Sequence, residues 1–394
     1  MLKTAIASFF SKVEVGAIKV VFWDGEELNA GTGEPKVQII FKKPLPLTFN
    51  ISDPILAFGD AFCDGYIDII GDYEELGRVL YLNKDLFKTD SNSNTRKLLG
   101  IVNDFSLKIK QKKNIEHHYD IGNDFYSLWL DNTMSYSCAY FKTPEDTLEQ
   151  AQLQKIDHTL KKLQLAPGQR LLDIGSGWGW LIIKAAQQYQ VKALGITLSD
   201  NQYEETKKRV HDLGLSSLVD VKLLDYLELN ESEYQFDKIV SVGMFEHVGQ
   251  ENYGKYLGKV NRLLAPGGLS LLHTITNPIE GPVNSWMIKN IFPGGHIPSL
   301  REIVNLLPEH DFHLLHLESL RMQYAITLDH WFANFEKHLD YITQKFGERF
   351  VRMWSMYLKG CAASFRVSGL DIHQLLFSKG LNNELPITYD YIYR

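Results

Sequence analysis

From about residue 170 onward, short apolar runs alternate with segments long enough to form helices. The runs read RLLDI, VKALGIT, VDVKLL, FDKIVSV and LSLLHTI. Each run has the length of a buried strand, and a strand followed by a helix-length segment is the repeating unit of a parallel sheet with crossover helices. The pattern therefore predicts an α/β fold class.

The chain on either side of this alternation has different patterns. Three runs near the N-terminus are rich in β-branched and aromatic residues and predict a small α/β unit: AIKVVFWDG, KVQIIFKKPLPLTFNI and YIDIIGD. Residues 88–113 pass from an Asn/Ser cluster into a basic segment with apolar positions, which predicts a linker leading into an amphipathic helix. After about Thr327, apolar residues recur at spacings of three and four, as in helices. We therefore expect a domain at 1–87, a linker and basic helix at 88–113, and a second domain at 114–394.

Composition and charge limit the partners that the chain can have. Its 394 residues suffice for about two domains, and a net charge of −7 argues against a broad nucleic-acid surface. Cys63, Cys138 and Cys361 form no CxxC pair, which supports neither a disulfide framework nor a zinc site and favours a reducing cytosol. The longest uncharged run, 263–279, contains a Pro-Gly-Gly turn, so we expect no segment that spans a bilayer.

The stretch LLDIGSGWG, residues 171–179, is an apolar strand that runs into three glycines. Glycines at such a turn let the backbone bend tightly and approach a ligand closely. The G-x-G-x-G spacing differs from the dinucleotide fingerprint, whose third glycine comes one residue later and whose next strand ends in an acid. The next strand here ends GITLS, without an acid. The loop is therefore similar to the S-adenosylmethionine motif of class I methyltransferases, although three glycines also suit a purely structural turn.

Three further polar stretches follow successive predicted strands. They are TLSDNQ at 197–202, Asp225-Tyr226, and GMFEHVG at 243–249. In an open α/β sheet, ligands bind beyond the carboxyl ends of the strands. An acid after the third strand is suited to the adenine amine, and the loop after the fourth strand to the methionine end or the substrate.

Taken together, several motifs resemble those of cyclopropane-fatty-acyl-phospholipid synthases. The motifs are HHYDIGNDFYSLWLDNTMSYSCAYF, LLDIGSGWG, GITLSDNQ, IVSVGMFEHVG and AASFRVSGLDIHQLLFS, spread over residues 117–378. The related mycolic acid cyclopropane synthases share this part but lack an N-terminal domain. The resemblance implies a Rossmann-like class I methyltransferase domain preceded by a smaller α/β lipid-binding domain.

The resemblance also implies an activity. Family members add a methylene group from S-adenosylmethionine across the cis double bond of an acyl chain in a membrane phospholipid. The alkene needs close alignment in a pocket that excludes water, and aromatic faces stabilise the cation that methyl transfer leaves. Candidate aromatic walls are Phe125, Tyr126, Tyr136, Tyr140, Phe141 and Phe245. For any single one of them, a place in the core is the more ordinary interpretation.

Ring closure requires a base, which in this family is thought to be a bound bicarbonate ion. Matched motif by motif, the resemblance assigns its binding to Cys138, Glu246, His273, Tyr324 and the backbone amide of Ile275. Cys138 would then be a donor to an anion rather than a nucleophile. A glutamate beside bicarbonate makes sense if it is protonated. Cys361 matches a position once regarded as a nucleophile in the family, but this chemistry needs none, which favours packing.

By the same matching, the cofactor contacts come from four segments. They are Tyr136 and Ser137; Leu171, Leu172, Asp173, Ile174, Gly175, Ser176, Gly177, Trp178 and Gly179; Thr197, Leu198, Ser199, Asp200, Asn201 and Gln202; and Asp225 with Tyr226. The resemblance includes no metal. It implies a homodimer, a cytoplasmic location and peripheral attachment to the inner face of the membrane.

Two segments are candidates for contact with the phospholipid bilayer. One is the basic segment with Lys108, Lys110, Lys112 and Lys113, and the other is WMIKNIFPGG at 286–295. A lysine run is also typical of a solvated face, and the apolar side chains of the second segment can equally pack inward.

Other functions remain open on the sequence alone. The nearest alternative is a methyltransferase of the same fold that acts on an amine or another small acceptor. Such an acceptor loses its own proton and needs no added base, so the predicted anion site argues against it. A lipid-binding protein that has lost its activity is disfavoured by the intact motifs, and a dehydrogenase is disfavoured by the loop spacing.

Overall fold

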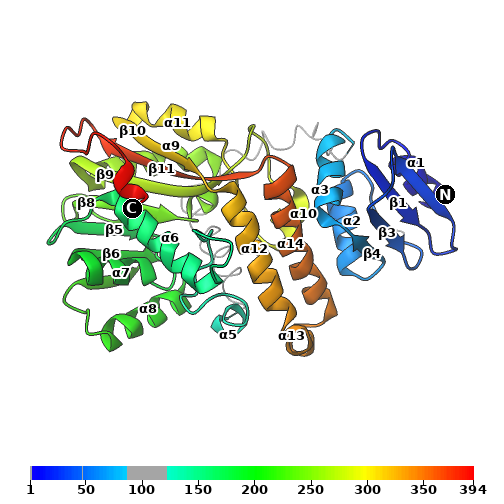
Figure 1. Ribbon diagram of the computed structural model, residues 1–394, viewed down its shortest axis with the longest axis horizontal. Helices are drawn as coiled ribbons and strands as arrows, with labels where there is room; N and C mark the ends of the chain where they lie inside the picture. The colour runs from blue at the N-terminus through cyan, green and yellow to red at the C-terminus, as the bar shows by residue number, and fades with distance from the viewer. Residues whose placement is uncertain (1, 47, 87–121) are drawn as a thin grey trace. The chain divides into compact units, whose positions relative to one another are not determined.

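The computed structural model describes residues 2–46, 48–86 and 122–394 (Figure 1). The chain forms two compact units, and each is assembled from separate chain segments. We call them the large unit, with described residues 122–282, 294–327 and 371–394, and the small unit, with 2–46, 48–86, 283–293 and 328–370.

These units differ from the contiguous domains that the sequence suggested. Residues 328–370 group with the N-terminal segment, because their helices pack on it rather than on the large sheet. The predicted linker and basic helix at 88–113 lie outside the described residues. Whether the predicted domain boundaries divide the functions of the chain stays a prediction.

The large unit contains a seven-stranded sheet with the order β10-β11-β9-β8-β5-β6-β7. Its strands are β5 Arg170–Ile174, β6 Lys192–Thr197, β7 Val219–Leu223, β8 Phe236–Val242, β9 Leu264–Thr276, β10 Phe312–Ser319 and β11 Asp371–Lys379. The first five pair in parallel, and β11 pairs antiparallel with both β9 and β10. The α/β fold class and the five strands predicted from the apolar runs are therefore confirmed.

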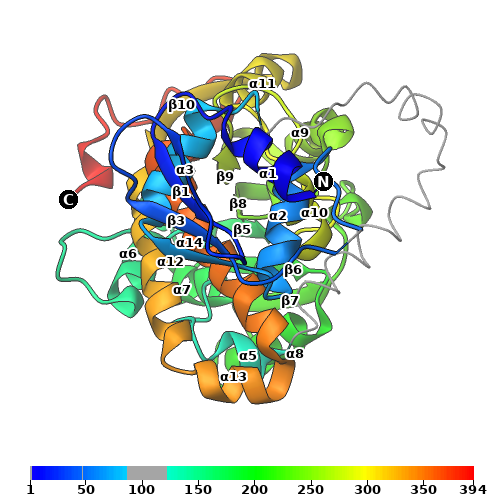
Figure 2. The same ribbon diagram turned by 90° about the vertical axis from the view of Figure 1, so that its right-hand side faces the viewer.

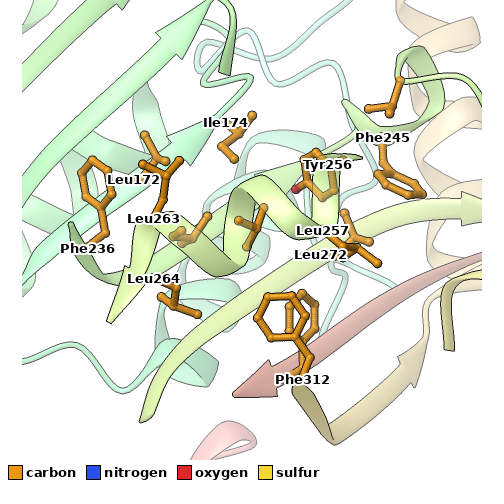
Figure 3. Packing of buried hydrophobic residues seen from close by; sticks show 14 of the residues in the cluster. Leu172, Ile174, Phe236, Phe245, Tyr256, Leu257, Leu263, Leu264, Leu272 and Phe312 are labelled. Atoms are coloured by element: carbon orange, nitrogen blue, oxygen red, sulfur yellow. The ribbon is translucent and has the colours of Figure 1, made fainter. Parts of the chain in front are cut away.

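Helices cover both faces of this sheet, as the crossover pattern predicted. They are α6 Leu148–Leu163, α7 Trp180–Tyr189, α8 Asp200–Asp212, α9 Tyr253–Leu263 and α11 Leu300–Leu306. Successive strand residues point to opposite faces, so Leu171 packs with α6 and α7. Leu172 and Ile174 pack with α9 in the cluster of Figure 3. Each face of the sheet thus has its own core.

The direction in which successive strands are added to the sheet reverses between β5 and β8. The chain runs from β5 outward to β6 and β7 and then returns to place β8 on the other side of β5. The loops after β5 and β8 therefore diverge and leave a crevice at the carboxyl ends of the strands, where ligands bind in such folds.

The small unit has a four-stranded sheet with the order β2-β1-β3-β4, of which β1 and β3 are labelled in Figure 2. Its strands are β1 Ala17–Val21, β2 Glu27–Gly31, β3 Val37–Phe41 and β4 Ile67–Gly71, and its N-terminal helices are α1 Leu2–Phe10, α2 Pro54–Cys63 and α3 Tyr73–Leu82. These elements enclose a separate core that includes Phe10, Val20 and Phe41. The predicted small α/β unit near the N-terminus is confirmed.

The other described segments of the small unit are also helical, and those after Thr327 agree with the predicted helices. They are α10 Ser285–Asn290, α12 Arg321–Glu336, which begins in the large unit, α13 Leu339–Phe346 and α14 Glu348–Val367. Arg352 of α14 donates to the carbonyl oxygens of Phe62 and Ile67 and to the Asp68 carboxylate. Trp286 of α10 packs directly on Gly59, where a Cβ atom would lie 2.4 Å from the indole. The apolar side chain of Trp286 therefore points inward.

Candidate active site

A cavity lies at the crevice of the large unit. It is lined by residues 133–137, 155, 156, 173–181, 196–198, 202, 224–226, 242–244, 247 and 248. Most of the predicted cofactor contacts are among them: Tyr136, Ser137, Asp173, Ile174, Gly175, Ser176, Gly177, Trp178, Gly179, Thr197, Leu198, Gln202, Asp225 and Tyr226. The fold thus brings segments more than 80 residues apart in sequence around one space.

Five predicted cofactor contacts do not line the cavity. Leu171 and Leu172 lie within β5, where their side chains enter the cores on opposite faces of the sheet. The Ser199 hydroxyl caps α8 by accepting from the Gln202 amide, and Asp200 and Asn201 are exposed on the first turn of that helix. Their positions suggest that they support the loop rather than touch its ligand.

The glycines after β5 differ in what a side chain at each position would meet. Gly175, Gly177 and Gly179 all have positive φ angles, of 83°, 54° and 83°. A Cβ atom on Gly179 would lie 2.3 Å from the Thr206 methyl group, whereas one on Gly177 would meet nothing within 4 Å. Gly179 is therefore required by packing, and Gly177 leaves room on the open side of the loop, next to the N-terminus of α7.

His247 lines the cavity and was not among the predicted contacts. Glu246 and His247 are adjacent in the motif GMFEHVG, and the resemblance assigned only Glu246 to the site. In the structure the two side chains have different surroundings, because His247 borders the cavity while Glu246 reaches toward β9. Burial lowers the pKa of His247 to about 4, so its ring is neutral at physiological pH.

Lys155 of α6 is a second lining residue that the sequence reasoning missed. It is only 4% exposed, and its Nζ donates to Ser137 Oγ at 2.9 Å. A lysine on the buried face of an amphipathic helix is rare, and its position four residues after Ala151 was the available signal. Burial lowers the pKa of Lys155 to about 8 and raises that of the Asp173 carboxyl, another lining residue, to about 7.

Glu246 lies after β8, and its side chain forms a hydrogen bond with the neighbouring strand β9. Its Oε1 accepts from the Ile275 amide at 2.7 Å, just beyond the point where β8 and β9 stop pairing. Its Oε2 is buried without a bonded partner among the described residues. Burial raises the pKa of the carboxyl, which favours the protonated form. The Ile275 amide, which the resemblance assigned to the bicarbonate ion, thus binds Glu246 in this arrangement.

His273 lies two residues before Ile275 on the same strand and is fully buried. Its Nδ1 is 3.0 Å from Nε2 of Gln374, an amide nitrogen that also donates to Thr159 Oγ1. Since an amide nitrogen only donates, Nδ1 accepts and the ring proton sits on Nε2. That Nε2 is buried without a bonded partner among the described residues. Burial holds the pKa of the ring well below its usual value, so it is a neutral donor.

Cys138 is completely buried, and its Sγ lies 3.3 Å from the carbonyl oxygen of Ala139. Burial raises the pKa of this thiol far above its usual value, so it is a neutral weak donor and not a thiolate nucleophile. Tyr324 lies in the first turn of α12 and is 9% exposed. Cys361 lies on α14 in the small unit, where burial raises the pKa of its thiol to about 12.

The predicted aromatic walls have different surroundings. Tyr136 lines the cavity. Phe125 and Tyr126, on the short helix α5 Asn123–Tyr126, are fully buried, and Phe245 stacks on Tyr253 at 4.4 Å within the core. Tyr140 stacks on His158 at 4.2 Å. Among these five side chains, Tyr136 lines the cavity, and the other four are buried or stacked on neighbouring side chains.

Comparisons with known proteins agree with this arrangement. The family model described as mycolic acid cyclopropane synthetase matches residues 106–375, and a model of a domain of unknown function matches residues 5–92. The chain is 36% identical to a probable fatty acid methyltransferase of Pseudomonas putida over 96% of both chains. It is 42% identical to the cyclopropane-fatty-acyl-phospholipid synthase of Escherichia coli strain K12 over 72% of both chains.

A solved structure is similar over the same region. The mycolic acid cyclopropane synthase CmaA1, complexed with SAH and CTAB, is 35% identical and has a TM-score of 0.64. The match covers 68% of this chain and 98% of that one. The resemblance deduced from the motifs is therefore confirmed, as is the methyltransferase fold of the large unit. With a family model that covers well over half of its length, the chain belongs to the mycolic acid cyclopropane synthetase family of S-adenosylmethionine-dependent transferases.

Proposed function

We propose that the protein transfers a methylene group from S-adenosylmethionine to the cis double bond of unsaturated acyl chains in membrane phospholipids, and so forms cyclopropane fatty acids. When bound, S-adenosylmethionine supplies an electrophilic methyl group. The glycine loop after β5 and the neighbouring loops after β6, β7 and β8 would hold it, because they line one cavity. The names of the relatives support both the reaction and the lipid substrate.

We further propose that a bound bicarbonate serves as the base. Methyl transfer to an alkene leaves a positive charge on the neighbouring carbon, and ring closure then requires loss of a proton from the transferred methyl group. Cys138, Glu246, His273 and Tyr324 would hold the ion. The neutral His273 ring and a protonated Glu246 are suited to an anion, since both can donate to it without charge repulsion.

One observation carries the proposal most directly. Glu246 Oε2 and His273 Nε2 are buried polar atoms without a bonded partner in the described part of the chain. Burying such atoms unpaired costs free energy of about 1–3 kcal/mol each, so they are expected to meet a ligand. An oxyanion that accepts from both atoms removes this cost. A methyltransferase for amines has no need of such a site.

The test is a labelling experiment with trideuteromethyl S-adenosylmethionine and liposomes of a cis-unsaturated phospholipid. Ring closure removes one deuteron, so the acyl chain gains about 16 mass units and resists ozonolysis. Acyl chains of unchanged mass in the presence of a bound cofactor would leave an amine or another small acceptor as the substrate. Adding and removing bicarbonate in carbon-dioxide-free buffer then tests the base.

A second candidate is methylation of the acyl chain without ring closure. It is favoured by the name of the relative that matches nearly the whole chain, a probable fatty acid methyltransferase. In that reaction the acyl chain keeps all three deuterons, gains about 17 mass units and retains a double bond. The same spectrum therefore separates the two reactions.

We also propose reversible attachment to the bilayer surface. Of the two candidate segments, the lysines at 108–113 lie outside the described residues. In 286–295, Trp286 and Ile291 are buried, so these side chains offer no exposed anchor. No helix in the described ranges combines the length and the apolar character needed to cross a membrane. Flotation with anionic liposomes at low salt is the test, and absence of the protein from the lipid fraction would contradict it. The expected homodimer and the expected cytoplasmic location stay predictions.

A further inference from the structure

The residues assigned to bicarbonate provide no positive charge. His273 is neutral because burial lowers its pKa, and the thiol of Cys138 and the amide of Ile275 are neutral as well. Glu246 is neutral at best. An anion taken into such a buried place loses its hydration and is costly without a compensating cation. A cation close to these groups is therefore required if an oxyanion binds here.

Lys155 is the buried cation next to them. It is 4% exposed, and its charge acts on both Cys138 and His273. Its hydrogen bond to Ser137 Oγ, at 2.9 Å, fixes the ammonium beside the residue that precedes Cys138. Lys155 also lines the cofactor cavity. It therefore borders the cofactor cavity and acts electrostatically on two of the residues assigned to the ion.

The ammonium group is incompletely satisfied by the protein. Lysine Nζ has three donors, and Ser137 Oγ is its one bonded partner among the described residues. The nearby carboxyl of Asp131 is occupied by Thr133 and the Ser135 amide. Asp173 acts on Lys155 only through space and has a buried Oδ1 without a bonded partner in the described part of the chain. Two ammonium donors thus remain for a ligand.

We propose that Lys155 binds a carboxylate-type oxyanion and supplies the positive charge that the bicarbonate site lacks. This inference rests on the proposed function for the identity of the ion. The same chemistry is offered by the carboxylate at the methionine end of the cofactor, since Lys155 lines the cofactor cavity. Bicarbonate is the source that we favour, because Cys138 and His273 lie within the field of the Lys155 ammonium. Lys162, the other buried lysine whose charge acts on His273, is paired with the Glu318 carboxylate.

The test compares Lys155→Met, which keeps the length of the side chain, with Lys155→Arg, which keeps its charge. Three titrations are made by calorimetry and need no turnover. Bicarbonate is titrated into the protein saturated with S-adenosylhomocysteine. S-adenosylhomocysteine and methylthioadenosine, which lacks the carboxylate, are each titrated into the free protein.

If Lys155 binds bicarbonate, Lys155→Met weakens bicarbonate binding by about tenfold or more and leaves S-adenosylhomocysteine affinity unchanged. If it binds the cofactor carboxylate, affinity for S-adenosylhomocysteine falls by that factor and affinity for methylthioadenosine does not. Lys155→Arg retains most of either affinity. Unchanged affinities in a folded Lys155→Met protein would overturn the proposal and make the lysine a packing residue.

The wild-type protein gives an independent readout if Lys155→Met fails to fold. Burial lowers the pKa of Lys155 to about 8, so oxyanion affinity should decline as the pH rises through this value and the ammonium is lost. The ionisable groups that act on Lys155 are Asp131, Asp173 and Cys138. Cys138 keeps its proton far above this pH and adds no step. Burial also raises the pKa values of Asp173 and Glu246, so the titration is repeated in Asp173→Asn and Glu246→Gln, and a decline that persists in both variants is assigned to Lys155. The absence of a decline would count against the proposal.

These readouts also separate the inference from the proposed function. If the wild-type protein leaves the lipid unchanged but binds bicarbonate in a Lys155-dependent manner, the proposed reaction is wrong and the oxyanion site stands. If the protein forms cyclopropane chains and Lys155→Met keeps both affinities, the reaction stands and the role of Lys155 is wrong.

Discussion

At the scale of single residues, the protonation state of Glu246 decides how the proposed anion site would work. Its Oε1 accepts from the Ile275 amide, so a protonated carboxyl presents its hydroxyl on Oε2. A glutamine reproduces this arrangement, with its oxygen toward Ile275 and its amide nitrogen as the donor. We expect Glu246→Gln to retain turnover within about tenfold, and Glu246→Ala to lose about 100-fold or more.

The pH dependence adds a second readout for Glu246. Burial raises the pKa of this carboxyl, so the acid form that donates to an anion is lost as the pH rises through that raised value. With bicarbonate saturating, so that loss of the Lys155 ammonium does not limit binding, the wild-type rate should fall with this step, and the rate of Glu246→Gln should not. A glutamine variant as inactive as the alanine variant would show that the ionised carboxylate is the working form.

The tautomer of His273 depends on Gln374, which donates to its Nδ1. A glutamate at 374 accepts instead, moves the ring proton to Nδ1 and leaves Nε2 as an acceptor that repels an anion. Gln374→Glu should therefore lower turnover by about 100-fold. Gln374→Met removes the hydrogen bond without reversing it and should cost less. Equal losses in the two variants, measured with thermal unfolding as a control, would point to packing alone.

At the scale of elements, two glycines in the loop between β5 and α7 are expected to have different roles, Gly179 in packing and Gly177 in binding the cofactor. An alanine at Gly179 meets the Thr206 methyl group at 2.3 Å and adopts a positive φ, so Gly179→Ala should lower the free energy of unfolding by about 2–4 kcal/mol. Gly177→Ala has open space around it and should cost about 1 kcal/mol. Denaturant unfolding gives both values.

Affinity for the cofactor should rank the two variants in the opposite order, with Gly177→Ala more affected than Gly179→Ala. A methyl group at Gly177 projects from the loop that lines the cavity, so this variant should bind S-adenosylhomocysteine about tenfold more weakly even where its fold is intact. If Gly177→Ala binds normally while Gly179→Ala does not, the loop presents its other side to the ligand.

Residues that follow strands were predictable from the sequence, whereas residues that depend on packing between distant segments were not. Gly177 and Asp225 come directly after apolar runs, and the parallel sheet gathers such positions at one edge. Gln374 comes from β11, where no apolar run or loop pattern relates it to the site. Lys155 comes from α6, where its place on the buried helix face was the one local sign. β10 was also missed, because an edge strand with Leu314 and Leu317 exposed lacks the apolar run of a central strand.

At the scale of the whole molecule, helical periodicity predicted α14 but not its partner. The helix packs on α3 of the small unit, nearly 300 residues earlier in the chain, and the sequence contains no local sign of this pairing. Gly77 lies at the point of contact, where a Cβ atom would be 3.2 Å from Val367 and 3.3 Å from Ala363. Because Gly77 has no side chain, α3 and α14 can approach each other closely at this point.

A large side chain at Gly77 should separate these helices and destabilise the small unit. We expect Gly77→Leu to lower the free energy of unfolding by about 1–3 kcal/mol, with affinity for S-adenosylhomocysteine unchanged because the cavity belongs to the large unit. Gly360→Ala is the matched control on α14: nothing lies within 4 Å of the added methyl group, and alanine should stabilise the helix by up to about 1 kcal/mol. If Gly77→Leu weakens cofactor binding as strongly as it lowers stability, the two units are energetically coupled and the small unit contributes to the active site.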